Sequence, residues 1–336
     1  MLVFSLFNLS QSETILFGVF ALIIAVFLLV DLGLFNKEAH KVTTKSALYQ
    51  SVFWVFISSL FGVFVYLNGP YVHEQGGLLV TTSGADASIQ YFSAYLTEYA
   101  LSVDNIFVIL LILKFFTVKE EYHHKILFWG ILGAVFFRGT FIFVIASLID
   151  RLHWILYIFG VFLIYSGIKI YFEDSDEKID PEKNPILRIC RKYLPISADD
   201  RGGKFMFREA GKLMFTPLFL VIILIETTDL IFAVDSIPAA FAITQNPFLI
   251  YTSNIFAVMG LRAMFFLLSG VIDKFYLLQK GLSIILFFIG AKMLLEIFDF
   301  HVDVVLSFLV IIATLTLSIV FSVVIPKKQK ADEEVF

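Results

Sequence analysis

Nine apolar stretches, each long enough to cross a lipid bilayer, constrain the fold of this chain more than any other feature. A bilayer core of about 30 Å requires roughly 20 apolar residues per helix. The stretches lie at about 12–34, 47–68, 90–114, 125–149, 153–172, 214–242, 251–272, 281–299 and 302–325. Only 16% of the 336 residues are charged, against roughly 25% in soluble domains, which suits a surface that faces lipid. The sequence therefore predicts an all-α, polytopic membrane protein.

Basic residues alternate between the connections and set the expected orientation. The connection at 173–213 carries nine Lys and Arg residues, whereas the connection at 69–89 carries none. Because cytoplasmic loops are enriched in Lys and Arg, this alternation predicts an external N-terminus and a cytoplasmic C-terminus. A net charge of −4 provides no basic surface for nucleic acid. The single cysteine, Cys190, excludes an intramolecular disulfide and a cysteine-cluster metal site.

Polar residues at membrane depth recur in the same order in two halves of the chain. Residues 98–106 and 229–237 both read as an acid, five residues, Asp, a small polar residue and Ile. The fourth and seventh stretches each hold one arginine, and the fifth and eighth each end in Gly-x-Lys-x₃-Glu. Polar residues are costly in hydrocarbon unless they are paired or line a cavity, so their repetition indicates an internal repeat.

The matched patterns predict two three-helix repeat units within one transmembrane domain. An odd number of spans makes the second unit enter the membrane from the opposite side, an arrangement typical of secondary transporters. The domain covers 1–336, with unit one at about 90–172, a cytoplasmic loop at 173–213, unit two at about 214–299, and flanking helices within about 12–68 and 302–325. We expect the loop to be solvated, with a membrane-surface helix around 186–194 as the alternative.

Two of the predicted helices carry five acidic residues, more than the buried arginines can neutralise. The acids are Glu98, Asp104, Glu226, Asp229 and Asp235. Clustered carboxylates ionise together only beside cations, so protons or a metal must make up the shortfall. Oxygen ligands suit Mg²⁺, Mn²⁺ and Ca²⁺, whereas the lack of His and Cys in these motifs argues against Zn²⁺ and Cu⁺. The pattern predicts a mid-membrane site for a hard divalent cation.

Four other polar residues belong to the same constellation. Arg138 and Arg262 are the predicted buried counter-charges, and Asn105 and Ser236 are the supporting polar residues beside the two repeated aspartates. Salt bridges to the arginines are an alternative role for individual acids, but two arginines cannot neutralise five carboxylates. The sequence contains no evident nucleophile–base pair or phosphate-binding loop, so we predict no catalytic residues and no permanent cofactor.

The spacing of the acids conflicts with a straight sixth helix. Glu226 and Asp235 are nine residues apart and would face opposite directions on a regular helix. Pro238 lacks the backbone N–H that a helix needs at that point. We therefore expect this helix to be broken between about 229 and 238, so that Asp104 and Asp235 face one shared cavity.

At these residues the chain resembles the TerC family of bacterial integral membrane proteins. The resemblance is carried by EYALSVDNIFV and IETTDLIFAVDSIPA, and it extends over nearly the whole chain. It implies a tellurium-resistance-type label, Mn²⁺ export across the cytoplasmic (inner) membrane, and a wider relation to LysE-type exporters. It also implies that the five acids listed above line the metal pathway, with Asn105 and Ser236 as neutral neighbours. Tellurite is an anion, which an acidic site would repel.

The resulting prediction is a multi-pass secondary transporter that exports Mn²⁺ by alternating access between the two inverted units. Mn²⁺ is the transported substrate, and exchange for protons at the same carboxylates stays open. One alternative is an exporter of Ca²⁺ or another hard divalent cation, which uses the same ligand types. Another is a membrane scaffold or assembly factor whose acids are structural. The sequence leaves the oligomeric state open.

Overall fold

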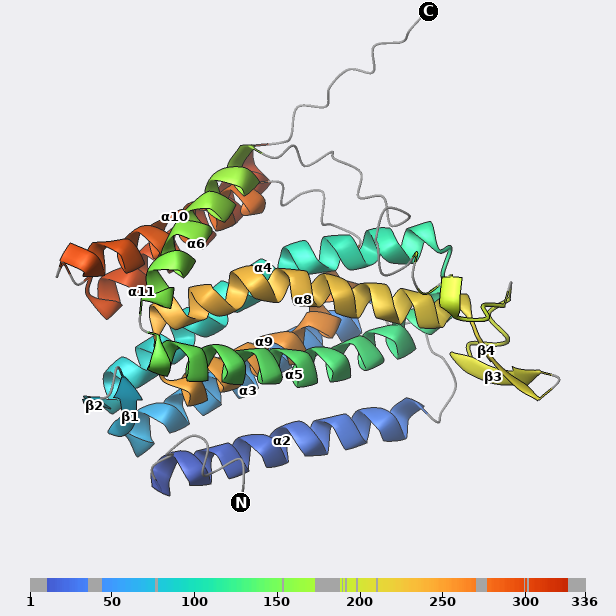
Figure 1. The fold of residues 1–336 in the computed structure, drawn as a ribbon, viewed down its shortest axis with the longest axis horizontal. Coiled ribbons are helices and arrows are strands. Elements are labelled where there is room, and N and C mark those ends of the chain that lie inside the picture. Colours follow the sequence, from blue (N-terminus) through green and yellow to red (C-terminus); the bar gives the residue numbers. More distant parts are fainter. Residues whose placement is uncertain are drawn as a thin grey trace, which may run out of the picture.

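The computed structural model shows a bundle of long helices that run in broadly similar directions (Figure 1). It describes residues 11–35, 44–75, 78–152, 154–172, 188, 190, 192–197, 199–209, 211–269, 277–298, 300 and 302–325.

The described residues contain nine helices, one for each predicted spanning stretch. They are α2 (Gln11–Phe35), α3 (Thr44–Asn68), α4 (Gly84–Phe115), α5 (Glu120–Arg151), α6 (Ile155–Phe172), α8 (Pro217–Ile243), α9 (Pro247–Leu268), α10 (Leu278–Leu295) and α11 (Val304–Val324). Eight of them are long and apolar enough to cross a membrane, and α2 contains a shorter apolar helical run, Ile15–Leu29. The predicted all-α, polytopic fold is confirmed.

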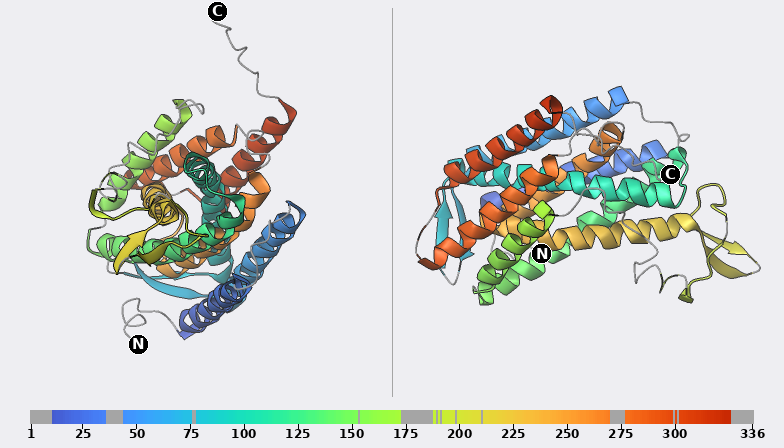
Figure 2. Two further views of the ribbon diagram at one scale, coloured as in Figure 1. Left: turned by 90° about the vertical axis from the view of Figure 1, so that its right-hand side faces the viewer. Right: turned by 90° about the horizontal axis from the view of Figure 1, so that it is seen from above.

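Two short antiparallel hairpins lie at opposite ends of the bundle (Figures 1 and 2). Strands β1 (Tyr71–Gln75) and β2 (Leu78–Thr82) connect α3 to α4. Strands β3 (Met206–Glu209) and β4 (Lys212–Phe215) lead directly into α8. The two ends of the bundle are called the β1–β2 end and the β3–β4 end below.

Helix α9 forms the centre of the bundle. Among the 18 most apolar consecutive residues of α9, 89% are buried inside the protein. The corresponding share in α11 is 17%, so the surface of that helix is largely open to lipid. Asn246 caps the start of α9 by accepting a hydrogen bond from the Phe248 amide at 2.9 Å, and Pro247 occupies the first helical turn. Helices α3, α4 and α5 pack around α9, so polar side chains on it lie deep in protein.

Helices α6 and α10 form a separate pair that packs through glycine (Figure 1). A Cβ added to Gly167 would lie 2.7 Å from the carbonyl oxygen of Ser283 and 2.9 Å from the amide nitrogen of Phe287. A Cβ added to Gly290 would in turn meet backbone atoms of Gly160 and Ile164 on α6, which lie seven and three positions before Gly167. Ser283 and Phe287 lie at the same two distances before Gly290, so each glycine makes the same contact with the other helix.

The predicted break in the sixth spanning helix is wrong. Helix α8 continues as one α-helix from Pro217 to Ile243 with Pro238 inside it. The proline removes one backbone donor but leaves its helical φ compatible with the turn, and membrane helices tolerate such a loss when neighbouring helices cover the site. A straight α8 instead directs Glu226 and Asp235 toward different neighbours, as the site geometry below shows.

The connection between α6 and α8 is structured where it reaches the bundle. Its β3–β4 hairpin lies near the start of α5, where Lys125 donates a hydrogen bond to the Gly203 carbonyl at 2.7 Å. The Lys125 ammonium also lies 4.7 Å from the centre of the Phe205 ring. Most residues of the two strands are exposed, in agreement with the expected solvated connection, and backbone pairing and these contacts give this part a defined structure. Most of the residues proposed for a surface helix around 186–194 lie outside the described residues or are isolated within them.

Candidate functional site

Arg138 lies at the centre of a charged network that joins four helices. It projects from α5 and is completely buried. Its Nε and Nη2 donate to the two carboxylate oxygens of Asp229 on α8, at 2.9 and 2.6 Å. Its Nη1 donates to Glu98 on α4 and to the side-chain oxygen of Asn254 on α9, the latter at 3.2 Å. Asn254 in turn donates to the other oxygen of Glu98 at 2.8 Å.

Every carboxylate oxygen of Glu98 and Asp229 therefore accepts a hydrogen bond from a protein donor. Glu98 is 3% exposed, and the Asp229 side chain is 13% exposed. A buried ion pair is stable only when its desolvation is repaid by such hydrogen bonds. The two acids are also equivalent positions of the sequence repeat, so one arginine bridges the first acid of both motifs.

Glu226 lies one helical turn before Asp229 on α8, and its surroundings are different. Both of its carboxylate oxygens are buried, and neither has a hydrogen-bond partner among the described residues. The carboxylate fills the space that a side chain at Gly133 on α5 would occupy. The absence of a Cβ at position 133 is what allows this carboxylate to lie between the two helices.

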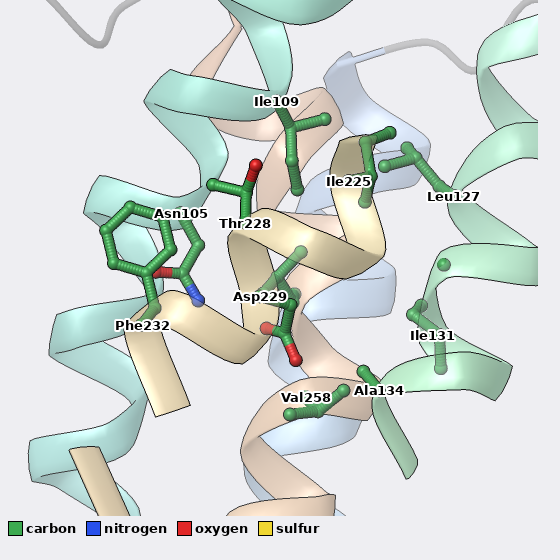
Figure 3. A pocket seen from close by; sticks show the side chains of 12 residues that line it. Asn105, Ile109, Leu127, Ile131, Ala134, Ile225, Thr228, Asp229, Phe232 and Val258 are labelled. Atoms are coloured by element: carbon green, nitrogen blue, oxygen red, sulfur yellow. The ribbon is translucent and has the colours of Figure 1, made fainter. Parts of the chain in front are cut away.

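A small cavity adjoins the network between α4, α5, α8 and α9 (Figure 3). Its volume is about 30 Å³, enough for one or two water molecules or one dehydrated ion. Its polar lining comes from Asn105, Thr228 and Asp229, and the rest is apolar. On α5 all its lining residues precede Arg138, so the cavity lies on the β3–β4 side of the network.

The face of α4 that carries Glu98 continues from the network to the cavity. Glu98, Ser102 and Asn105 are spaced by four and three residues, which places them on one helical face. Ser102 is 0% exposed, and its hydroxyl has no hydrogen-bond partner among the described residues. A buried hydroxyl without a partner among the described residues thus lies between Glu98 and Asn105 on this face.

Asp235 occupies a different place from the Arg138 network. It accepts a hydrogen bond at 2.9 Å from the hydroxyl of Ser166 on α6. It lies six residues beyond Asp229, about 9 Å along the helix axis toward the β1–β2 end. The next residue, Ser236, is buried, and its hydroxyl has no hydrogen-bond partner within the described part of the chain. Asp235 does not line the cavity described above.

The remaining predicted residues are placed only in part. Asp104 belongs to α4, but its side chain lies outside the described part of the structure, so a cavity shared with Asp235 stays a prediction. Arg262 lies on α9 and is half-buried. Among the described side chains, no three His, Cys, Asp or Glu residues come close enough to hold one metal ion together. The described acids instead form one arginine-paired centre, Glu226 beside it, and Asp235 farther along α8.

Three contributors to the site were not predicted from the sequence. Asn254 completes the Arg138 network, Ser166 binds Asp235, and Gly133 accommodates Glu226. Asn254 stands in a Thr-Ser-Asn run inside an apolar stretch, so the rule that singles out polar residues at membrane depth also applies to it. Ser166 and Gly133 are too common in membrane helices to stand out by type alone.

A polytopic helical bundle with charged side chains buried among its apolar helices defines an integral membrane protein. Residues 83–330 match the integral membrane protein TerC family. The match covers well over half of the chain, and the chain belongs to this family.

Relatives of similar length share about two-fifths of their residues with this chain. The "Putative membrane-bound redox modulator Alx" of Escherichia coli (strain K12) is 40% identical over 309 residues, 92% of this chain and 94% of the relative. The "Uncharacterized membrane protein STKORF319" of Myxococcus xanthus is 40% identical over 283 residues, 84% and 83% of the two chains. An "Uncharacterized membrane protein" of Rickettsia bellii is 39% identical over 311 residues, 92% and 97% of the two chains. No solved structure matches the chain.

Proposed function

We propose that this protein is a secondary transporter that exports a hard divalent cation, with Mn²⁺ as its substrate, from the cytoplasm. The observation that carries the proposal is Glu226, whose two buried carboxylate oxygens lie one turn from Asp229 and have no hydrogen-bond partner among the described residues. An ionised carboxylate is costly in such a place, so a proton or a metal ion has to neutralise it, and exchange of one for the other would transport the metal. Transport requires no reacting residue, and we assign no enzymatic activity.

The donors around the cavity favour a hard cation. Asp229, Asn105 and Thr228 line it with carboxylate, amide and hydroxyl groups, and Glu226 lies one turn away on the same helix. Oxygen donors suit Mn²⁺, Mg²⁺ and Ca²⁺, and they bind Zn²⁺ less selectively than His and Cys do. Export of Ca²⁺ by the same residues is the alternative, since Ca²⁺ accepts the same ligand types.

The position of the cavity supports entry from the β3–β4 end. Arg201, Lys204, Arg208 and Lys212 lie in or beside this hairpin, and basic connections mark the cytoplasmic side of a membrane protein. The cavity lies on that side of Arg138, whereas Asp235 lies farther toward the opposite end. The order Glu226, Asp229 and Asp235 along α8 would then follow the direction of export, with protons as counter-ions at Glu226 and Asp235, the two acids of this helix that Arg138 does not hold.

Alternating access would use the two predicted inverted units. The reciprocal glycine contact between α6 and α10 supports this arrangement, because two related units predict a contact that is the same in both directions. A thiol-based redox role fits the chain less well. Its one cysteine, Cys190, allows no disulfide within a single chain.

Metal uptake into everted vesicles of a bacterial membrane tests the proposal. Vesicles with the wild-type protein should accumulate Mn²⁺, and a panel of Ca²⁺, Mg²⁺, Fe²⁺ and Zn²⁺ establishes selectivity. Glu226→Gln should lose at least about 90% of the uptake, equivalent to about 1.4 kcal/mol of lost binding. Glu209→Gln makes the same acid-to-amide change on the exposed hairpin and should leave uptake unchanged. No uptake of any of the five cations by the wild type would refute transport.

A further inference from the structure

We propose that Arg138 is a tethered counter-cation, which holds Glu98 and Asp229 while the carrier is empty and releases Asp229 to the transported cation. The inference rests on the cation transport proposed above and names the group with which the cargo competes. All four oxygens of these two acids already accept hydrogen bonds from Arg138 or Asn254. Each oxygen keeps a second lone pair, but a cation that chelates both oxygens of Asp229 competes with the two parallel N–H groups of Arg138 for the same edge of the carboxylate.

The exposure of the two acids determines which contact is given up. Asp229 is 13% exposed and lines the cavity. Glu98 is only 3% exposed, and it also accepts a hydrogen bond from Asn254. An ion that enters the cavity therefore reaches Asp229 before Glu98. Arg138 loses two hydrogen bonds when Asp229 leaves, and it keeps its contacts with Glu98 and Asn254. Asn254 thus holds the guanidinium in the protein during the exchange.

Glu226 provides the first attachment for the cargo. Its oxygens have no donor to displace, and it lies one turn before Asp229 on the β3–β4 side. A cation bound there would be next to Asp229 and close enough to the Arg138 guanidinium for the two positive charges to repel each other. Repulsion between the two positive charges would then help Arg138 to leave Asp229.

Arg138 would therefore affect two steps differently, the binding of the cation and the return of the empty carrier. An empty carrier that reorients with two unpaired carboxylates at membrane depth faces a large barrier. Arg138 offsets one charge and hydrogen-bonds both acids, so the empty form can return without cargo. Removing the guanidinium should therefore favour cation binding and hinder the empty return step.

Transport assays in proteoliposomes separate these two steps. Net Mn²⁺ efflux requires the empty return, whereas exchange of internal for external labelled Mn²⁺ does not. Arg138→Met should lose at least about 90% of net efflux, keep Mn²⁺ exchange, and bind Mn²⁺ about 10-fold more tightly, the equivalent of about 1.4 kcal/mol. Arg201→Met makes the same change at an exposed arginine and should leave all three quantities unchanged.

A conservative variant keeps the test decisive if Arg138→Met does not accumulate in the membrane. Arg138→Lys retains the charge but cannot bind Asp229 through two parallel N–H groups. It should retain net efflux and bind Mn²⁺ about 3-fold more tightly than the wild type, about 0.6 kcal/mol.

Three outcomes would overturn the counter-cation role. They are equal loss of exchange and net efflux in Arg138→Met, unchanged or weaker Mn²⁺ binding in that variant, and unchanged or weaker binding in Arg138→Lys. Each would make Arg138 a structural bridge. Wild-type protein without Mn²⁺ efflux or exchange would refute the transport function itself, which is a different result from any of these.

Discussion

The Arg138 network and the α6–α10 contact join helices by different means. Around Arg138, charged and amide side chains connect α4, α5, α8 and α9 through directional hydrogen bonds. Between α6 and α10, the glycines Gly167 and Gly290 let one backbone lie directly against the other. A cation can compete for the first kind of contact, whereas no ligand can replace the second.

This difference predicts which contacts would change in the proposed transport cycle. Close packing at small residues is a main source of helix association in lipid, where no hydrophobic effect drives helices together. Helix α6 belongs to the first predicted repeat unit and α10 to the second. We therefore expect the α6–α10 pair to stay together as a pivot while the charged network opens and closes.

The largest effect is expected from a side chain at the glycine contact. Gly290→Val would place a Cβ about as close as 2.6 Å to the carbonyl oxygen of Gly160. Backbone atoms cannot move away as a flexible side chain can, so the variant should lose at least about 3 kcal/mol of stability. Reduced amounts of protein in the membrane and a lower thermal midpoint in detergent are the expected readouts.

Gly18→Val is the matched control for this prediction. A Cβ at Gly18 on α2 would meet nothing within 4 Å, so this variant should accumulate normally. Added Mn²⁺ should not rescue Gly290→Val, since no cation binds between α6 and α10. Normal accumulation of Gly290→Val, or rescue by Mn²⁺, would mean that the pair is not a fixed contact.

The second prediction removes a charge while preserving its local geometry. In Asp235→Asn, the amide oxygen can still accept the hydrogen bond from Ser166, so the fold should be retained. Export should fall at least about 100-fold, equivalent to about 2.7 kcal/mol, because the pathway toward the β1–β2 end loses its carboxylate. Asp104→Asn, the equivalent change in the other motif, should have the same effect in vesicle uptake assays.

Ser166→Ala tests whether charge or hydrogen bonding matters at this position. It removes the donor but keeps the Asp235 carboxylate, so most export should remain. Full manganese export by Asp235→Asn would exclude a metal-pathway role for this acid and would limit the functional centre to the Arg138 network.

Much of the fold could be predicted from the sequence because the membrane restricts the choice of structures. A stretch of about 20 apolar residues has to satisfy its backbone internally, which leaves the helix as the only form for each of the nine segments. The hairpins could not be predicted in this way. Residues 206–209 pair with residues 212–215 through their backbone, and their docking depends on Lys125 and Phe205, which lie far apart along the chain.

The site was predicted less completely because the type of a residue does not determine which neighbouring helix its side chain faces. Five carboxylates in two helices suggested one cluster, and a broken sixth helix was invoked to bring Glu226 and Asp235 together. A continuous α8 directs these two acids toward α5 and α6 instead. Which acid Arg138 pairs with depends on helix packing, and the sequence pattern contains no information about the position of Asn254 relative to Glu98.

The third prediction displaces Glu226 without changing any charge. In Gly133→Ala, the new methyl group would occupy the position of the Glu226 carboxylate, which has to turn away. The carboxylate is the end of a flexible side chain, so the loss of stability should stay below about 1 kcal/mol. Mn²⁺ uptake should nevertheless fall about 10-fold, equivalent to about 1.4 kcal/mol.

Gly18→Ala is the control, because it makes the same change on α2, which does not line the cavity. Its Cβ would meet nothing within 4 Å. Uptake should change much less than in Gly133→Ala. Equal uptake in the two variants would show that the location of the Glu226 carboxylate does not matter for transport.

The smallest effect is expected where a charged side chain holds a surface element. Lys125→Met keeps the apolar stem near Phe205 and removes the hydrogen bond to the Gly203 carbonyl, at a cost of about 1 kcal/mol. Amide hydrogen exchange in the β3–β4 hairpin should accelerate, while Mn²⁺ uptake should stay at the wild-type level. Lys119→Met removes an exposed contact with Asp200 at 3.4 Å and one with the Tyr122 ring at 5.7 Å, and it should change neither quantity. A large loss of uptake in Lys125→Met would contradict the division between movable and fixed contacts, because it would make the hairpin part of the transport cycle.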